Sequence, residues 1–206
     1  MYKTQKLAGL LFDMGGVVFE IDFERAVQNW SDWTNLSIEE IKHRFKMDVA
    51  YEQHERGNIE ASEYFSHLRN ILELEATDSE IALGWNAIYL EEISETVNYI
   101  LAVKEKIPCF AFTNSNPTHQ VFWRAAYPRA VESFQQIFVS SELGLRKPDR
   151  EAFEAISDII GISLGELLFF DDTEENIKGA RAAGMQAVHV RAHTDVRKAL
   201  VDISVL

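Results

Sequence analysis

The stretch LLFDMGGVV, residues 10–18, determines how the chain begins to fold and where its chemistry starts. The apolar run over residues 7–12 is short enough for a buried parallel strand. Asp13 follows this run directly, and Gly15 and Gly16 come soon after it. Because glycine permits tight backbone turns, we expect this loop to turn sharply and to direct amide groups toward a bound anion.

Further apolar runs along the chain predict more buried strands, at residues 108–112, 136–139, 167–170 and 187–190. Segments with helical character lie between the later runs, at residues 95–106, 149–160 and 176–183. Gly184 follows the last of these segments and is expected to end that helix. Strands and helices that alternate at this spacing predict a doubly wound α/β sheet.

The segment between about residues 22 and 93 breaks this alternation, because its pattern indicates helices only. The expected helices span residues 23–34, 37–47, 49–56, 61–72 and 78–89. Ser37 and Asp78 each precede acidic residues that favour a helix start. We therefore predict a core made of residues 1–20 and 94–206, with residues 21–93 inserted as a helical cap over the carboxyl edge of the sheet.

The composition narrows the classes of protein and partner. The chain has 206 residues and a net charge of -13, which argues against nucleic acid as a partner. Its apolar runs are too short for a signal peptide or a membrane span. The single cysteine, Cys109, excludes an intrachain disulfide, and its apolar neighbours predict a buried thiol. We expect a cytoplasmic protein, and the sequence leaves its oligomeric state open.

Polar side chains follow several of the predicted strands. Parallel sheets bind ligands beyond the carboxyl ends of their strands, so these side chains are expected to meet at one edge. The set consists of Asp13 after the first strand, Thr113 and Asn114 after the second, Lys147 in a later loop, and Asp171 and Asp172 after the fourth. Taken one at a time, they are also typical of turns, helix caps and a solvated lysine.

Together these residue types suit phosphoryl transfer. A carboxylate such as Asp13 can attack phosphorus and form an acyl phosphate. Two anions repel one another, so the attack needs a hard cation, and Mg²⁺ prefers carboxylate oxygens of the kind that Asp171 and Asp172 offer. Lys147 could neutralise a phosphate oxygen, and hydrogen bonds from the strand-end Thr113–Asn114 pair could support it.

The same residues resemble the four motifs of the haloacid dehalogenase-like superfamily. The motifs are Leu10 to Asp13 with Gly16 to Val18, then Thr113-Asn114, then Lys147-Pro148, then Phe169 to Asp172 with Asn176. The run from Gln53 to Gly57 and the run from Gly144 to Pro148 are similar to the bacterial α-D-glucose-1-phosphate phosphatases of that superfamily. This resemblance extends over nearly the whole chain.

The resemblance implies a Rossmann-like core, a small helical cap, Mg²⁺ dependence and a phosphorylated sugar as substrate. It implies that Asp13 is the nucleophile and that Asp13, the Gly15 carbonyl and the acidic pair, chiefly Asp172, hold the metal. It also implies that Asn114 and Lys147 bind the phosphate.

The chain departs from the superfamily at Gly15, where most of its phosphatases carry an aspartate that protonates the leaving oxygen. Loss of general acid–base help slows a reaction by about 10²–10⁴-fold. The anomeric oxygen of a sugar 1-phosphate leaves more readily and needs less protonation. As a hypothesis, water, Asp22 or His54 fills part of the role.

Three other interpretations remain open at this stage. A haloacid dehalogenase would use the same aspartate on carbon, but its reaction needs no metal. A phosphomutase is disfavoured by Gly15. A protein that keeps the fold but only binds metabolites or a partner is favoured by Gly15 and disfavoured by retention of Asp13 and Lys147.

Overall fold

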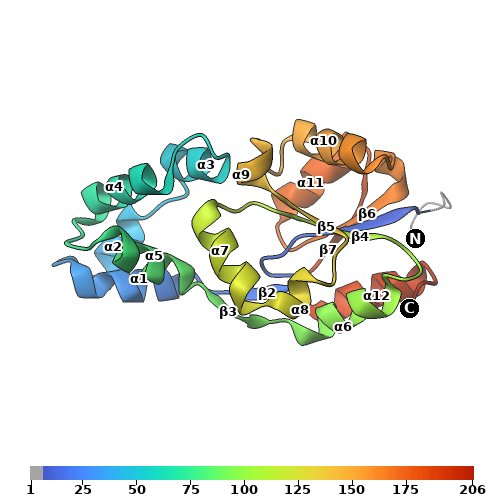
Figure 1. Ribbon diagram of the computed structural model, residues 1–206, viewed down its shortest axis with the longest axis horizontal. Coiled ribbons are helices and arrows are strands. Elements are labelled where there is room, and N and C mark those ends of the chain that lie inside the picture. The colour runs from blue at the N-terminus through green and yellow to red at the C-terminus, as the bar shows by residue number, and fades with distance from the viewer. Residues whose placement is uncertain (1–6) are drawn as a thin grey trace.

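The computed structural model describes residues 7–206 and contains a five-stranded parallel sheet in the order β5-β4-β1-β6-β7 (Figure 1). Its strands are β1 (Gly9–Phe12), β4 (Cys109–Thr113), β5 (Gln136–Val139), β6 (Leu167–Asp171) and β7 (Gln186–His189). Every neighbouring pair in this sheet is parallel. The predicted doubly wound α/β fold is confirmed, with strand ends displaced by one or two residues.

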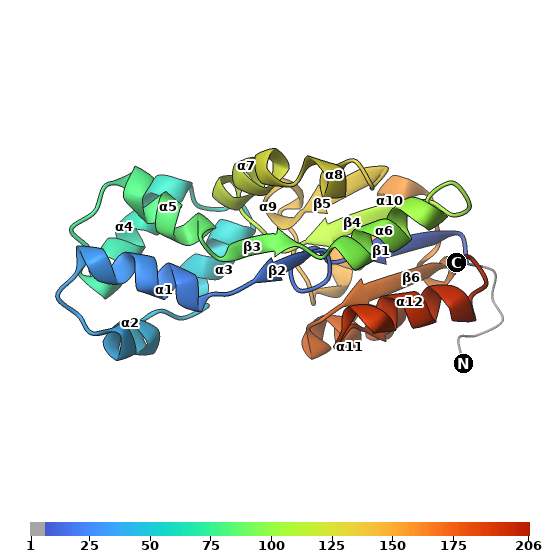
Figure 2. The same ribbon diagram turned by 90° about the horizontal axis from the view of Figure 1, so that it is seen from below.

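Helices cover both faces of the sheet (Figure 2). Side chains alternate along β1, so that Leu10 and Phe12 join one buried cluster and Leu11 joins the other. The first cluster also includes residues of α6 (Ser94–Val103) and α12 (His193–Asp202). The second includes residues of α10 (Arg150–Ile160) and α11 (Glu174–Ala183). Burial on both faces explains why the strands are continuous apolar runs.

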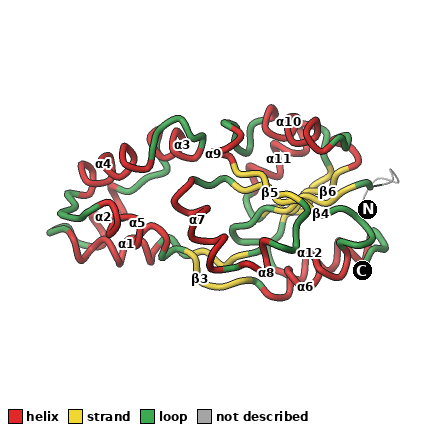
Figure 3. Tube along the Cα trace, viewed as in Figure 1, coloured by secondary structure: helices red, strands yellow, loops and turns green. Residues whose placement is uncertain are grey.

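A separate group of helices forms a lobe beside the sheet, which Figure 3 shows as helices joined by loops. These helices are α1 (Glu24–Trp30), α2 (Ile38–Arg44), α3 (Val49–Glu55), α4 (Ala61–Leu72) and α5 (Asp78–Asn86). They pack around their own buried cluster, in which Trp30 and Trp85 stack with ring centroids 5.6 Å apart. We call residues 24–86 the helical lobe.

The expectation that residues 22–93 form helices only is wrong. The predicted helix over residues 78–89 ends at Asn86, and the chain continues as β3 (Tyr89–Glu92). This strand pairs in antiparallel fashion with β2 (Phe19–Ile21), and the Phe19 and Tyr89 rings meet edge to face at 5.9 Å. The pair carries the chain out to the helical lobe and back. Both strands are too short to give a clear periodic pattern in the sequence.

The local signals at helix ends are largely confirmed. Ser37 caps α2 through a reciprocal pair of bonds with Glu40. At α5 the cap is Thr77 instead of Asp78. Gly184 ends α11 with a φ of 105°, a conformation that glycine adopts without strain. The remaining helices are α7 (Pro117–Ala126), α8 (Pro128–Val131) and α9 (Ser140–Leu143), with short 3₁₀ turns at Ser31–Trp33 and Leu164–Glu166.

One prediction that follows from composition concerns Cys109. Cys109 is fully buried, so the predicted buried thiol is confirmed, and burial raises the pKa of this thiol to about 12. Within residues 7–206, no helix is both long enough and apolar enough to cross a membrane.

Candidate active site

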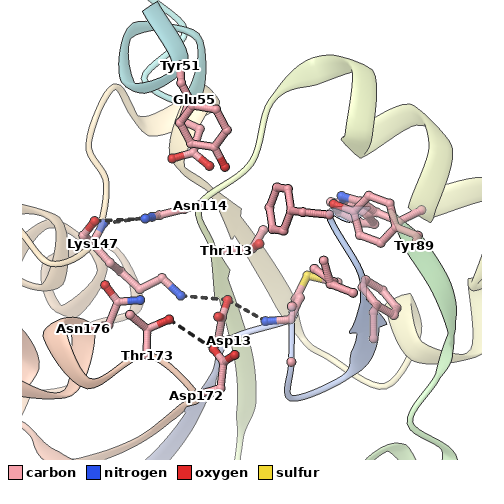
Figure 4. Close-up of a pocket in the computed structure, with 17 residues that line it drawn as sticks. Asp13, Tyr51, Glu55, Tyr89, Thr113, Asn114, Lys147, Asp172, Thr173 and Asn176 are labelled. Atoms are coloured by element: carbon pink, nitrogen blue, oxygen red, sulfur yellow. Dashed lines mark hydrogen bonds and ion pairs between the residues drawn. The ribbon is translucent and has the colours of Figure 1, made fainter. Parts of the chain in front are cut away.

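Three carboxylates meet at the carboxyl edge of the sheet, as the strand-end prediction required. Asp13 follows β1, Asp171 ends β6 and Asp172 comes next. Each offers an oxygen, and these oxygens all lie within 4.8 Å of one another. Figure 4 shows Asp13 and Asp172 side by side at the floor of a pocket of about 380 Å³. A cavity of this size accommodates a small organic ligand.

Lys147 lies among these carboxylates and is almost completely buried. Its Nζ is 2.7 Å from Asp13 Oδ1 and 2.8 Å from Asp171 Oδ2. The ammonium group also lies 5.3 Å and 5.4 Å from the ring centroids of Phe112 and Phe169. Burial lowers the pKa of Lys147, but Asp13 and Asp171 together more than offset this, so the net pKa is raised. Lys147 is therefore a fixed positive charge.

The charges around Asp13 do not balance without a further cation. Burial is the largest cause that raises the pKa of Asp13 to about 8; Lys147 opposes the rise, and Asp171 and Asp172 add to it. Three carboxylates thus share one ammonium group. The site fits a hard divalent cation, because closely spaced carboxylate oxygens are the ligands that such an ion takes.

Asp171 and Asp172 differ in how much of their bonding capacity is already used. Asp171 is fully buried and accepts bonds from Lys147, from the Thr173 amide (2.8 Å) and from Asn176 Nδ2 (3.1 Å to each oxygen). Asp172 is exposed, and among residues 7–206 its carboxylate accepts only the Thr173 hydroxyl, at 3.3 Å. Asp172 therefore has free oxygens for a metal, while Asp171 orients Lys147 and Asn176.

Gly16 is required by the close approach of Asp172. Its φ is +68°, and a Cβ added there would lie 2.2 Å from Asp172 Oδ2. One expectation about this loop is wrong, however. The Gly16 amide does not face the pocket for a phosphate, because it donates to the Phe19 carbonyl oxygen at 2.9 Å. That bond closes the turn between β1 and β2.

Asn114 and Thr113 line the pocket at the end of β4. The Asn114 side chain binds the backbone of Lys147 in both directions: its Nδ2 donates to the carbonyl oxygen, and its Oδ1 accepts from the amide, each at 2.9 Å. Asn114 thereby holds the loop that carries Lys147. Its predicted contact with phosphate stays a prediction, as does that of Thr113, which is buried beside it.

Gly15 also lines the pocket, and neither residue hypothesised to replace its missing side chain does so among the described residues. His54 is buried in the helical lobe and stacks on Tyr64, with ring centroids 4.7 Å apart. The Asp22 carboxylate accepts the Glu24 amide at 2.9 Å. The predicted role of the Gly15 carbonyl as a metal ligand stays a prediction.

Two residues of the helical lobe reach the pocket instead, Tyr51 and Glu55 of α3. Figure 4 shows both side chains above Asn114, across the pocket from Asp13. They are four residues apart and so share one helix face. That spacing, directly before the turn at Gly57, is the signal that could have selected them over His54.

The fold and the site define a class of α/β proteins that gather three carboxylates and a buried lysine at the carboxyl edge of a parallel sheet. The model of the haloacid dehalogenase-like hydrolases matches residues 7–184, and the chain belongs to that family.

Relatives and solved structures agree with this assignment. D-ribitol-5-phosphate phosphatase of Bacteroides thetaiotaomicron is 23% identical, with 96% of this chain and 98% of that protein covered. A phosphatase of Mycobacterium tuberculosis, MT3486, is 28% identical over 97% of this chain and 95% of its own length. The structure of the family enzyme BT-2542 of Bacteroides thetaiotaomicron, in complex with magnesium and inorganic phosphate, has a TM-score of 0.77 at 28% identity, with 88% of this chain and 92% of that chain covered.

Proposed function

We propose that the protein is a Mg²⁺-dependent phosphatase that hydrolyses small phosphate monoesters. The observation that carries the proposal is the placement of Lys147 against Asp13, with Asp172 free beside them, at the floor of a ligand-sized pocket. This arrangement gives a nucleophile, a fixed positive charge and open metal-binding oxygens. The magnesium and phosphate in the BT-2542 structure support it.

Only one of the two carboxylate oxygens of Asp13 is available for the reaction. Its Oδ1 accepts both the Met14 amide and Lys147, each at 2.7 Å, which leaves Oδ2 to attack phosphorus. A bond forms between Oδ2 and phosphorus, and the bond from phosphorus to the alcohol oxygen breaks. The alcohol leaves with the electron pair and takes a proton from water. Attack by a second water then releases phosphate and restores the carboxylate.

The charged residues have distinct tasks in this sequence of steps. Lys147 binds a phosphate oxygen and offsets the charge that develops there. Asp171 and Asn114 keep Lys147 in place. Asp13 and Asp172 would hold Mg²⁺, which, when bound, neutralises negative charge on nucleophile and substrate. The charge cluster gives a haloacid dehalogenase less support, since that reaction has no use for a metal.

For the substrate, we propose phosphorylated sugars or polyols, such as α-D-glucose 1-phosphate. Gly15 supplies no proton donor, so an alcohol that leaves readily suits the site. The relative that acts on D-ribitol 5-phosphate supports a polyhydroxylated substrate. We also propose that residues 21–93 act as a cap that closes the pocket above the sheet. A further proposal, based on the single buried thiol, is that the protein works in the cytoplasm.

The test is phosphate release from a panel of sugar and polyol phosphates, with and without Mg²⁺, by the wild type and by Asp13→Asn. We expect Mg²⁺-dependent release that the variant loses, because an amide cannot form the acyl phosphate. If the folded, metal-loaded wild type releases phosphate from no ester, the phosphatase proposal fails and a binding protein of this fold takes its place.

A further inference from the structure

The floor of the pocket carries Lys147 among carboxylates, and its roof carries a further carboxylate, that of Glu55. Lys147 lies at the floor beside Asp13, where the phosphate is to be bound. The roof is the face of α3 that carries Tyr51 and Glu55. A phosphate ester that binds with its phosphorus at Asp13 therefore directs its alcohol portion toward these two residues. No step of the proposed reaction uses them.

Glu55 is held firmly although it belongs to the helical lobe. It is only 4% exposed, and its Oε2 accepts Arg146 Nε at 3.0 Å and Arg146 Nη2 at 2.7 Å. Both bonds go to one oxygen, so Oε1 remains for another donor. Tyr51 lies one helical turn before Glu55 on the same face of α3. Because Arg146 directly precedes Lys147, one loop positions both ends of the pocket.

We propose that Glu55 and Tyr51 form a leaving-group subsite that accepts hydroxyl groups of a neutral, polyhydroxylated alcohol and rejects leaving groups that carry a second negative charge. This inference rests on the proposed phosphatase function and names the substrate class that the site selects.

The charges that face Glu55 explain why the subsite would accept hydroxyl groups and why it would reject a second negative charge. Burial raises the pKa of Glu55, and Arg146, Tyr51 and Lys147 offset only part of this rise. The two bonds from the Arg146 guanidinium favour the carboxylate form of Glu55, which accepts hydrogen bonds and donates none. A substrate hydroxyl satisfies the carboxylate, whereas a substrate carboxylate or second phosphate is repelled in a site of low dielectric.

The pocket also has apolar lining that suits the same ligand. Ile21, Phe23 and Tyr89 belong to this lining. Their surfaces can cover the carbon-bound hydrogens of a sugar or polyol while Glu55 takes its hydroxyl groups. A pocket with apolar walls and few well-placed polar groups has the usual design of a small-molecule site.

The test compares two substrates that differ at one terminal carbon, sorbitol 6-phosphate with a hydroxymethyl group and 6-phosphogluconate with a carboxylate. We expect the wild type to prefer the neutral ester by at least about tenfold in kcat/KM. Glu55→Gln should reduce this preference about tenfold, mainly through KM, because it removes the charge and keeps the shape. Tyr51→Phe should raise KM for the neutral ester by a smaller factor.

Glu52→Gln is the matched control. Glu52 lies on the same helix and pairs with the same arginine at 3.5 Å, but it is half-exposed and does not line the pocket. The preference of the Glu52→Gln variant for the neutral ester should equal that of the wild type. Thermal unfolding of each variant shows that it is folded, and hydrolysis of p-nitrophenyl phosphate reports the phosphoryl-transfer machinery independently.

Several results would overturn the subsite. One is an unchanged preference in a folded Glu55→Gln variant that still hydrolyses p-nitrophenyl phosphate. Another is an equal fall in kcat on every ester with loss of one limb of the pH–rate profile, which would assign proton transfer to Glu55 instead. Absence of turnover by the wild type on all esters would refute the phosphatase function itself, and is thus distinguishable from failure of the subsite.

Discussion

The sheet edge and the helical lobe hold their charged groups in different ways. At the edge, Lys147, Asp171 and Asn176 are buried, and Asp171, at the end of a strand of the parallel sheet, binds both of the others. On the lobe, Glu55 reaches the pocket from a seven-residue helix and is held by an arginine of the other part of the molecule. The difference indicates that phosphoryl transfer depends on the rigid sheet, whereas the choice of alcohol depends on a separately packed unit.

Lys147→Met should have the largest effect and should break the sheet-edge network. The buried carboxylates of Asp13 and Asp171 would lose their shared cation, which costs about 3–5 kcal/mol of unfolding free energy. The kcat/KM should fall at least about 10²-fold, because a donor to the phosphate is lost. Urea unfolding in the presence of a chelator measures the first effect.

Lys178→Met is the control for this substitution. Lys178 pairs with Glu174 at 2.9 Å, but both side chains are largely exposed. Its loss should leave stability and activity unchanged. If Lys147→Met unfolds at the same urea concentration as the wild type, the buried network does not have the role assigned to it.

Gly16→Ala tests the metal-binding half of the edge. The added methyl group would strike Asp172, and the φ of +68° would strain an alanine. We expect the apparent affinity for Mg²⁺ to fall by about 10–100-fold, because the position of a metal ligand is disturbed. Gly161→Ala is matched in φ, at +69°, but has open space around it. The Gly161→Ala variant should have similar backbone strain but an unchanged affinity for Mg²⁺. Equal Mg²⁺ affinities in the two variants would refute the proposed clash with Asp172.

The sequence predicted the sheet edge well because parallel-sheet geometry translates directly into position. A polar residue at the end of a buried apolar run must lie at the carboxyl edge, which places Asp13 and Asp171 without further information. The roles of Asn114 and Gly16 were harder, because their partners, Lys147 and Asp172, are far away in the chain.

The helical lobe was predicted less well. His54 and Glu55 are neighbours on one helix, and the sequence does not tell which of them faces the pocket. In the structure His54 turns inward onto Tyr64, and Glu55 turns toward Arg146. That choice is set by how α3 packs, which depends on contacts across the whole lobe. The β2–β3 pair was missed for a related reason, because its stability comes from packing more than from pattern.

His119 lies where the helical lobe meets the part of the molecule that contains the sheet, so its protonation tests the contact between them. Its ring nitrogen Nε2 is 3.3 Å from the Trp85 carbonyl oxygen, and Tyr89 and His54 are its other close aromatic or titratable neighbours. Burial lowers the pKa of His119 to about 3; the Trp85 carbonyl opposes this and His54 adds to it. The folded protein therefore binds this proton less readily than the unfolded chain, whose histidine has a pKa of about 6.5.

The sign of the pH effect follows from that difference. Above pH 6.5 both states are neutral at this position and the full stability is present. Between pH 6.5 and about 3 the unfolded chain gains the proton first, so stability falls. The wild type should lose roughly 2 kcal/mol from this group between pH 7 and pH 5, and His119→Gln should lose correspondingly less. His43→Gln, at an exposed position of α2, should behave as the wild type; parallel curves for all three proteins would contradict the assignment.

Arg56→Gln should have the smallest effect and is the finest test of the separation between the two parts. Arg56 of the helical lobe pairs with Asp149 beside the Lys147 loop, at 2.5 Å, and both side chains are partly exposed. Its loss should therefore cost less than about 1 kcal/mol of stability. If the lobe only holds the alcohol, KM should rise a few-fold while kcat stays constant in steady-state kinetics. Arg150→Gln removes a pair of similar length, 2.6 Å, within α10, and should change neither constant. A fall in kcat for Arg56→Gln at constant KM would mean that the lobe also sets the geometry at Asp13, so that transfer and selection are not separable.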